Sequence, residues 1–336
     1  MNSSIGSQRM TIPLAERYRD RLPFTDATPM VSLGEGSTPL LPAPRLSERL
    51  GVELWLKWEG ANPTGSFKDR GMTIAVSKAV EEGAQAVVCA STGNTAASAA
   101  TYAARAGLTA VILQPAGQVA RGKIAQAQAV GARLFEVQGP FEGALDVARE
   151  LGRRGTHALV NSLNPYRLEG QKTAAFEIVD ELGGAPDALA LPYGGGGNTR
   201  AYALGFDEAG AGLPPLVAGE ATARAFTMAT AIRIAEPAHR AQAEEAIARS
   251  GGSTVGLEDD EILSAWRDLA ELEGVFCEPS SAAGLAALTR ERPQAGARVV
   301  CVITGHGLKD PDAAARLSSP PLAVPPDADA IAEAAL

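Results

Sequence analysis

Short runs of aliphatic residues alternate with helical patterns along nearly the whole chain. The runs that predict strands lie at residues 86–90, 109–113, 133–137, 158–161, 188–191, 216–218, 275–277 and 298–303. Several of the helical segments between them are closed by glycine, namely Gly83, Gly107, Gly131 and Gly152. Parallel strands need a crossover connection, which is usually a helix. The alternation therefore predicts an α/β fold in which mostly parallel sheets are covered by helices on both faces.

The length and composition of the chain exclude several classes of function. With 336 residues, of which 46% are hydrophobic and 21% charged, the sequence predicts two domains with ample core. The net charge of −9 disfavours a nucleic acid as partner, because phosphate backbones bind basic surfaces. No run of about eighteen apolar residues is present, so no membrane span is expected. The N-terminus lacks a secretory signal pattern, so a cytoplasmic location is expected. The three cysteines and three histidines have no metal-ligand spacing.

Turns rich in glycine or hydroxyl groups directly follow four of the predicted strands. They lie at residues 91–95, 194–198, 279–281 and 304–307. Open α/β sheets bind their ligands at the carboxyl ends of strands. The turn Ser-Thr-Gly-Asn-Thr at 91–95 opens a helix whose free N–H groups can bind an anion, although a plain capped turn has the same composition. The four glycines at 194–197 leave consecutive N–H groups unobstructed. They predict a phosphate site, since a flexible linker would not stand between a strand and a helix.

Lys68 is expected in the first turn of a helix. Apolar residues recur between positions 72 and 80 with the spacing of a buried helix face. Ser66 or Asp69 is expected to cap the N-terminus of this helix. An ammonium group is poorly placed there, because the helix dipole and desolvation both lower its pKa. The same position suits a neutral amine or a Schiff base. The alternative is a lysine whose stem packs against the protein while its head reaches water.

Two further segments carry polar side chains at strand ends. Thr304 could hydrogen-bond a pyridine nitrogen without protonating it. His306, between two glycines, is interpreted as structural in preference to an acid–base role. In the segment Asn-Ser-Leu-Asn-Pro-Tyr-Arg, Asn161 and Arg167 could hold an anionic substrate group, because arginine suits bidentate phosphate or carboxylate binding. An arginine at the protein surface is the alternative.

Taken in order, these motifs resemble those of the fold-type II (tryptophan synthase β-like) pyridoxal-phosphate enzymes, and among them the threonine synthases. The matching segments are residues 62–72, 90–98, 161–173, 229–234, 277–283 and 304–311, and the likeness extends over nearly the whole chain. The resemblance implies two open, mostly parallel twisted sheets covered by helices, with the cofactor between the domains. A large domain of residues 1–60 and 161–317 and a small domain of residues 61–160 are expected. Residues 318–336 are expected to form a loosely held, proline-rich tail.

The resemblance also implies roles for individual residues toward pyridoxal 5'-phosphate. Lys68 would form the Schiff base and shuttle protons, Asn94 would bind the phenolic oxygen, and Thr304 would face the pyridine nitrogen. The residues implied for the cofactor phosphate are Gly194, Gly195, Gly196, Gly197 and Asn198. Those implied for the carboxylate and phosphate of the substrate are Ser91, Thr92, Thr95, Asn161 and Arg167.

The activity implied by the resemblance is the conversion of O-phospho-L-homoserine and water to L-threonine and phosphate. The expected partner is therefore a small amino-acid substrate, and a homodimer is the expected assembly. The chain departs from the pattern of the family at the cofactor loop, Gly-Gly-Gly-Gly-Asn in place of Gly-Asn-Ala-Gly-Asn, and at Glu220, where an uncharged glutamine is usual. The tetraglycine loop resembles that of serine and threonine dehydratases. A dehydratase-like lyase, a β-replacement enzyme, and a relative of phosphohomoserine as substrate therefore stay open as alternatives.

Overall fold

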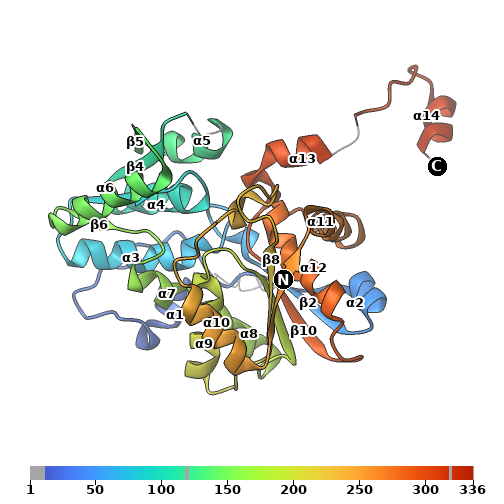
Figure 1. Ribbon diagram of the computed structural model, residues 1–336, viewed down its shortest axis with the longest axis horizontal. Coiled ribbons are helices and arrows are strands. Elements are labelled where there is room, and N and C mark those ends of the chain that lie inside the picture. The colour runs from blue at the N-terminus through green and yellow to red at the C-terminus, as the bar shows by residue number, and fades with distance from the viewer. Residues whose placement is uncertain (1–11, 118–120, 318–319, 336) are drawn as a thin grey trace, which may run out of the picture.

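A computed structural model describes residues 12–117, 121–317 and 320–335 of the chain. Two sheets, each flanked by helices, make up the body of the protein and lie side by side (Figure 1). This arrangement confirms the α/β fold of two mostly parallel sheets that the sequence predicts.

The larger sheet has six strands in the order β1-β2-β10-β7-β8-β9. β1 pairs with β2 in antiparallel fashion, and the other recorded pairs of this sheet are parallel. Its strands are β1 (Leu40–Pro42), β2 (Glu53–Trp58), β7 (Ala188–Pro192), β8 (Leu216–Ala221), β9 (Ser253–Leu257) and β10 (Arg298–Ile303). β10 and β7 lie at the centre of this sheet and are buried along almost their whole length.

The smaller sheet has four strands in the order β5-β4-β3-β6, and all of its recorded pairs are parallel. Its strands are β3 (Ala86–Ala90), β4 (Thr109–Pro115), β5 (Arg133–Val137) and β6 (His157–Leu159). β3 is buried along its whole length, as expected for the centre of a parallel sheet. Its carboxyl end leads into the hydroxyl-rich turn at residues 91–95.

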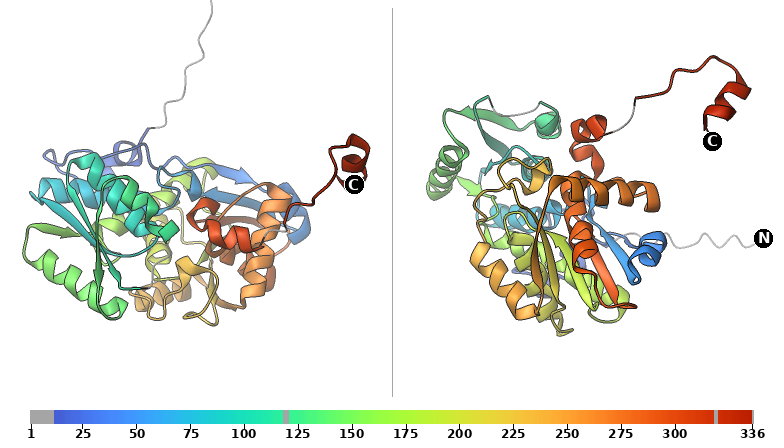
Figure 2. Two further views of the ribbon diagram at one scale, coloured as in Figure 1. Left: turned by 90° about the horizontal axis from the view of Figure 1, so that it is seen from above. Right: turned by 45° about the vertical axis from the view of Figure 1, so that its right-hand side comes forward.

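Helices cover both sheets, and Figure 2 shows the two groups from two further directions. Around the smaller sheet lie α3 (Lys68–Glu81), α4 (Asn94–Ala106), α5 (Arg121–Ala129) and α6 (Phe141–Arg153). The other α-helices are α1 (Leu14–Arg17), α2 (Pro44–Leu50), α7 (Pro165–Gln171), α8 (Thr173–Leu182), α9 (Gly197–Ala209), α10 (Arg240–Ser250), α11 (Asp259–Glu273), α12 (Ala283–Glu291), α13 (Pro311–Leu317) and α14 (Ala328–Ala335). Short 3₁₀ helices are η1 (Arg19–Arg21), η2 (Glu59–Ala61), η3 (Thr230–Ile232), η4 (Pro279–Ala282) and η5 (Gly307–Lys309).

Seven of the eight predicted strands are present, with small differences at their ends. The prediction for residues 275–277 is wrong, because this segment is irregular and forms a single bridge between Cys277 and His306. β1, β2 and β9 were not predicted. None of these three strands is a run of aliphatic residues in the sequence. β1 is only three residues long, β2 contains the charged residues Glu53 and Lys57, and β9 contains a glycine.

Helices α3 and α7 cross in close contact, and a glycine of each makes this possible. A Cβ atom at Gly71 of α3 would lie 2.5 Å from the carbonyl oxygen of Arg167, and one at Gly170 of α7 would lie 1.8 Å from that of Arg70. Real side chains cannot approach backbone atoms so closely. The glycines therefore bring the helix that begins at Lys68 into contact with the helix that carries Arg167.

A buried ion-pair cluster fixes the first turn of α3 to the larger sheet. The guanidinium group of Arg70 donates to Glu59 from Nε (2.7 Å) and Nη2 (2.8 Å), and to Glu177 from Nη1 (2.7 Å). Lys57 also pairs with Glu177 at 2.9 Å. All four side chains are buried and cut off from water, so each charge is stabilised by the opposite charge beside it. Burial raises the pKa of Glu177, but the cations of Arg70 and Lys57 outweigh this effect and hold it well below its ordinary value.

The C-terminal segment extends away from the body in each view (Figures 1 and 2). Residues 320–327 have little regular structure, and α14 follows them. The predicted proline-rich tail begins at residues 318 and 319, which lie outside the described residues, and its terminal helix was not predicted.

Candidate functional site

The strand ends that carry the predicted motifs are tied together by backbone contacts. The N–H of Phe67 donates to the carbonyl of Thr304 at 3.0 Å, and Ser66 forms an isolated bridge with Gly305. The turn before Lys68 is therefore held at the carboxyl end of β10. The N–H of Glu278 donates to the carbonyl of Gly305 at 3.1 Å, which brings a third segment to the same place.

Lys68 is the first residue of α3, as predicted. Its Nζ lies 4.1 Å from the centroid of the Phe67 ring, and no described residue accepts a hydrogen bond from it. Loss of hydration lowers the pKa of Lys68 to about 7, and the nearby cation of Arg167 acts in the same direction, whereas Glu278 opposes it. An amine with this pKa is about half unprotonated near neutral pH, and the unprotonated form can act as a nucleophile and a base.

The capping residues predicted for α3 are wrong. Phe67 occupies the N-cap position without a side-chain hydrogen bond. The buried hydroxyl of Ser66 has no partner among the described residues. The carboxylate of Asp69 accepts from the N–H of Thr64 (2.7 Å) and from Ser98 of α4 (2.6 Å). Asp69 therefore fastens two other segments to α3, and burial raises its pKa to about 6.

Gly194, Gly195 and Gly196 lie between β7 and α9, and Gly197 is the first residue of α9, so the glycines stand between a strand and a helix as predicted. Gly196 has φ of +81°, and a Cβ there would lie 2.9 Å from the carbonyl oxygen of His239, so a side chain is excluded twice over. Asn198 Nδ2 and the hydroxyl of Thr199, in the first turn of α9, are buried without a partner among the described residues. Unobstructed backbone donors and orphaned polar atoms at a helix N-terminus fit a phosphate group.

Asn94 begins α4 and faces a carboxyl group that sequence reasoning missed. Its Nδ2 donates to Oε1 of Glu278 at 2.9 Å. Glu278 is 3% exposed, and burial raises its pKa to about 7. Glu278 directly precedes the hydroxyl-rich turn at residues 279–281, but no local pattern singles out its carboxyl group. Only the contact with Asn94, which lies far away in the sequence, identifies Glu278 as part of the site.

Thr304 follows β10 and is buried, as the prediction for a ring-nitrogen partner requires. Its hydroxyl and that of Ser281 lie 2.9 Å apart and share a hydrogen bond. Ser281 also accepts from the N–H of Gly305 at 2.9 Å. These contacts hold the Thr304 hydroxyl in place through a neutral partner.

Arg167 lies in the protein interior, so the surface alternative for this residue is wrong. It is 1% exposed, and Nη1 donates to the carbonyl of Val160 at 2.9 Å. Nε and Nη2 are buried and have no hydrogen-bond acceptor among the described residues. Burial lowers the pKa of Arg167 to about 10. A buried guanidinium with two unused donors is chemically suited to bind an anion.

Asn161 also lies in this region, but its amide is already engaged. Its Oδ1 accepts from the N–H of Ala90 at 3.0 Å and its Nδ2 donates to the carbonyl of Ala90 at 2.8 Å. Asn161 therefore joins the end of β6 to the end of β3. One amide hydrogen and one lone pair are left for a ligand.

The hydroxyls predicted for the substrate lie at the N-terminus of α4. Ser91, Thr92 and Thr95 are all half-buried. The Ser91 hydroxyl accepts from the N–H of Gly93 at 3.3 Å, and Gly93 occupies the N-cap position without a side-chain hydrogen bond. The free N–H groups of this helix are thus open to an anion.

Two other residues singled out in the sequence, His306 and Glu220, are held by contacts with neighbouring side chains and backbone groups. His306 accepts from the N–H of Leu308 at 3.1 Å and lies between the rings of Trp58 and Phe276. This agrees with the structural interpretation. Glu220, at the end of β8, is paired with Arg224, which also donates to the carbonyl of Gly194 at 3.4 Å.

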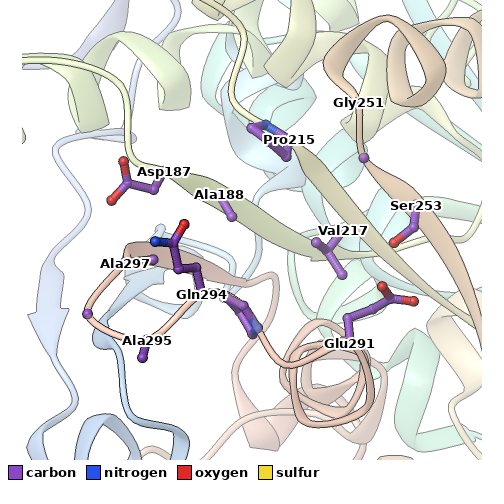
Figure 3. A pocket seen from close by; sticks show the side chains of 13 residues that line it. Asp187, Ala188, Pro215, Val217, Gly251, Ser253, Glu291, Gln294, Ala295 and Ala297 are labelled. Carbon is purple, nitrogen blue, oxygen red and sulfur yellow. The ribbon is translucent and has the colours of Figure 1, made fainter.

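A surface depression of about 640 Å³ lies at the opposite, amino-terminal edge of the larger sheet (Figure 3). Asp187 and Ala188 at the start of β7, Ser253 at the start of β9 and Glu291 line it. It is far from the strand ends described above. None of its lining side chains carries a buried polar atom that lacks a partner in the described part of the chain. It is therefore not a candidate for the chemistry.

The described residues contain no group of His, Cys, Asp or Glu that could hold a metal ion. None of the described helices is long and apolar enough to cross a membrane.

Comparisons with known proteins show the family to which the chain is similar. The family model described as "Pyridoxal-phosphate dependent enzyme" matches residues 31–305. A threonine synthase of Synechocystis sp. is 51% identical over 343 residues, covering 96% of this chain and 90% of the relative. One of Halalkalibacterium halodurans is 50% identical over 320 residues, covering 90% of each chain. The solved structure of a threonine deaminase from Solanum lycopersicum has a TM-score of 0.72 at 24% identity and covers 84% of this chain and 87% of its own, which shows a shared fold.

Proposed function

Because the chain belongs to the family of pyridoxal-phosphate dependent enzymes, we infer that it catalyses the reaction of its threonine synthase relatives. This reaction converts O-phospho-L-homoserine and water to L-threonine and phosphate, and the enzyme is a carbon–oxygen lyase. The observation that carries the inference is identity of about half of all residues over at least nine-tenths of both chains. The dehydratase-like neighbours share the fold at much lower identity.

Pyridoxal phosphate, when bound, supplies an electron sink for the carbon atoms next to the substrate amine. Lys68 is the residue suited to hold it covalently, because its lowered pKa of about 7 leaves a large share of the amine unprotonated near neutral pH. The glycine turn with Gly194, Gly195, Gly196 and Gly197, together with Asn198, offers backbone and amide donors for its phosphate. Thr304 offers a neutral hydroxyl for the ring nitrogen, and Asn94 offers an amide for the ring oxygen.

Lys68 is also the base that we propose for the proton transfers of the reaction. Elimination of the γ-phosphate and addition of water both need protons moved at neighbouring carbon atoms. A lysine amine of pKa about 7 can accept and return them without a large free-energy difference. Its position at the edge of the site, with no carboxylate of the described residues in contact, leaves Nζ free to do so.

Arg167 is the residue that we propose for the phosphate of the substrate. Two of its donors are buried without a partner, and the cost of burying a guanidinium is offset when an anion pairs with it. The remaining hydrogen of the Asn161 amide and the hydroxyls of Ser91, Thr92 and Thr95 supply further donors. A serine or threonine dehydratase has no substrate phosphate to hold, so this arrangement favours threonine synthase over the dehydratase alternative.

The decisive experiment is a side-by-side steady-state assay on O-phosphohomoserine, threonine and O-phosphoserine. Phosphate, 2-oxo acids and amino-acid products are measured for each. We expect L-threonine and phosphate in equal amounts from O-phosphohomoserine, and at most slow turnover of the other two. A protein that deaminates threonine but ignores O-phosphohomoserine would be a dehydratase, and one that acts best on O-phosphoserine would be a β-replacement enzyme.

The organisation of the protein around this site is also a proposal. We assign residues 1–60 and 161–317 to a large domain and residues 61–160 to a small one, since β1 and β2 join the larger sheet. A homodimer in the cytoplasm is the state that we propose. Light scattering of the purified protein tests the assembly, and a mass of one chain, 34.6 kDa, would contradict it.

A further inference from the structure

Glu278 is a buried carboxyl group that contacts one of the proposed cofactor residues, Asn94, and the roles assigned above do not use it. Its backbone is fixed on both sides, because its N–H donates to Gly305 (3.1 Å) and its carbonyl accepts from Ser281 (2.9 Å). A Cβ at Gly305 would lie 2.3 Å from Oε1 of Glu278. The carboxyl group thus occupies space that only a glycine leaves free at the end of β10.

The charges around Glu278 come from three elements. Asn94 of α4 donates to Oε1, Lys68 of α3 lies nearby, and Lys309 and Asp310 lie in and after η5. Burial raises the pKa of Glu278, and Lys309, Asn94 and Lys68 oppose this, whereas Asp310 reinforces it. Among the described residues, the amide of Asn94 is the one donor that is hydrogen-bonded to this carboxyl group.

An asparagine amide needs such a partner to be a specific ligand. The torsion that turns the amide plane is broad, so an unheld amide can present either nitrogen or oxygen to a ligand. Oε1 of Glu278 accepts from Nδ2 of Asn94, and a carboxyl group keeps an acceptor oxygen whether or not it is protonated, so this contact selects the nitrogen side of Asn94. The nitrogen carries two hydrogens, and fixing one in the amide plane also fixes the direction of the other.

We propose that Glu278 is a positioning residue, which holds one N–H of Asn94 so that the second N–H points at the ring oxygen of the bound cofactor. The proposal rests on the proposed function, because that function supplies the cofactor. Its effect is on the cofactor and not on the choice of substrate. It therefore predicts changes that are measurable before any substrate is added.

The test is a double-mutant cycle on cofactor binding to the apoprotein. Glu278→Leu keeps much of the side-chain volume and removes the acceptor, and Asn94→Ala removes the amide. Each variant is titrated with pyridoxal 5'-phosphate, and the dissociation constant is read from absorbance and fluorescence. We expect each single change to weaken binding about tenfold, and the double variant to lose little more than either one. Losses that multiply to about a hundredfold in the double variant would overturn the proposal.

A conservative variant separates the hydrogen bond from the charge. Glu278→Gln keeps an oxygen that Asn94 can donate to, so its affinity for the cofactor should stay within about threefold of the original. Because the negative charge is lost, the pH midpoint of the absorption band of the bound cofactor should shift. Affinity as weak as that of Glu278→Leu would contradict a positioning role. Glu291→Gln, an exposed carboxylate in the depression of Figure 3, is the matched control and should change neither quantity.

Two further outcomes also decide between the proposals: a Glu278→Leu variant that does not fold, and a wild-type protein that binds no cofactor. If Glu278→Leu does not fold, the same cycle is run with Glu278→Met, which also removes the acceptor, and is read as the dissociation constant of the cofactor. Losses that multiply in the double variant would overturn the proposal. A wild-type protein that binds no cofactor would contradict the proposed function itself, whereas independent effects in a protein that binds it contradict the role of Glu278 alone.

Discussion

Arg167 should contribute to catalysis at the expense of stability, and Arg167→Met tests both effects in one variant. Burial lowers the pKa of this arginine from 12.5 to about 10, which corresponds to about 3 kcal/mol of unfavourable free energy in the folded state. The lowered pKa means that the unfolded chain binds the proton more tightly. The full cost is therefore present at every pH below about 10 and fades only as pH rises above it.

The expected change in the free energy of unfolding of Arg167→Met has two parts, one from the lost charge and one from the lost hydrogen bond. Removing the charge recovers about 3 kcal/mol, and losing the hydrogen bond to the carbonyl of Val160 costs about 1–3 kcal/mol. We expect the apoprotein to be equally stable or up to about 2 kcal/mol more stable in urea unfolding. Arg70→Met is the matched control, because Arg70 is equally buried but fully paired with Glu59 and Glu177. It should cost about 3–5 kcal/mol, since it leaves buried carboxylates without a partner.

The magnitude for catalysis follows from the two unused donors of Arg167. A hydrogen bond to a charged group contributes about 1.5–3 kcal/mol, so Arg167→Met should lower kcat/KM for O-phosphohomoserine about tenfold to a hundredfold. Slow turnover of unphosphorylated threonine or serine should hardly change. The reasoning is refuted if Arg167→Met destabilises the apoprotein as much as Arg70→Met does. It is also refuted if phosphorylated and unphosphorylated substrates lose activity equally.

The remaining predictions concern the cofactor. Borohydride reduction should attach it to Lys68, and Lys68→Ala should abolish its absorption band. Because the pKa of Lys68 is lowered to about 7, covalent attachment to the apoprotein should rise as pH increases through that value, and label on another lysine would exclude Lys68. Gly195→Val should weaken cofactor binding without unfolding the protein, because a Cβ there meets only Ile234 at 3.6 Å, whereas Gly196→Val should also lower stability. If both variants kept the affinity of the original protein for the cofactor, the cofactor phosphate would not bind at this turn. Thr304→Asp should shift the absorption band and alter the ratio of elimination to side products, and an unaltered spectrum would remove Thr304 from the site.

The sequence by itself determined the features that depend on neighbouring residues. The aliphatic runs of β3 and β10 were located to the residue, because a buried parallel strand must be apolar on both faces. The position of Lys68 at the start of α3 and the glycine turn before α9 were also local features. Motifs that follow strands could then be placed at one edge, since parallel strands end on the same side.

Only the tertiary structure decided which partners each polar side chain finds. Asp69 could have capped its own helix, but in the fold Thr64 and Ser98 lie close enough to donate hydrogen bonds to its carboxylate. Asn94 and Glu278 are 184 positions apart, and no local pattern joins them. Whether Arg167 is paired or left with free donors depends on the close crossing of two helices. Hydrogen bonds and charges act over a few ångströms in space, so they are fixed by packing and not by order along the chain.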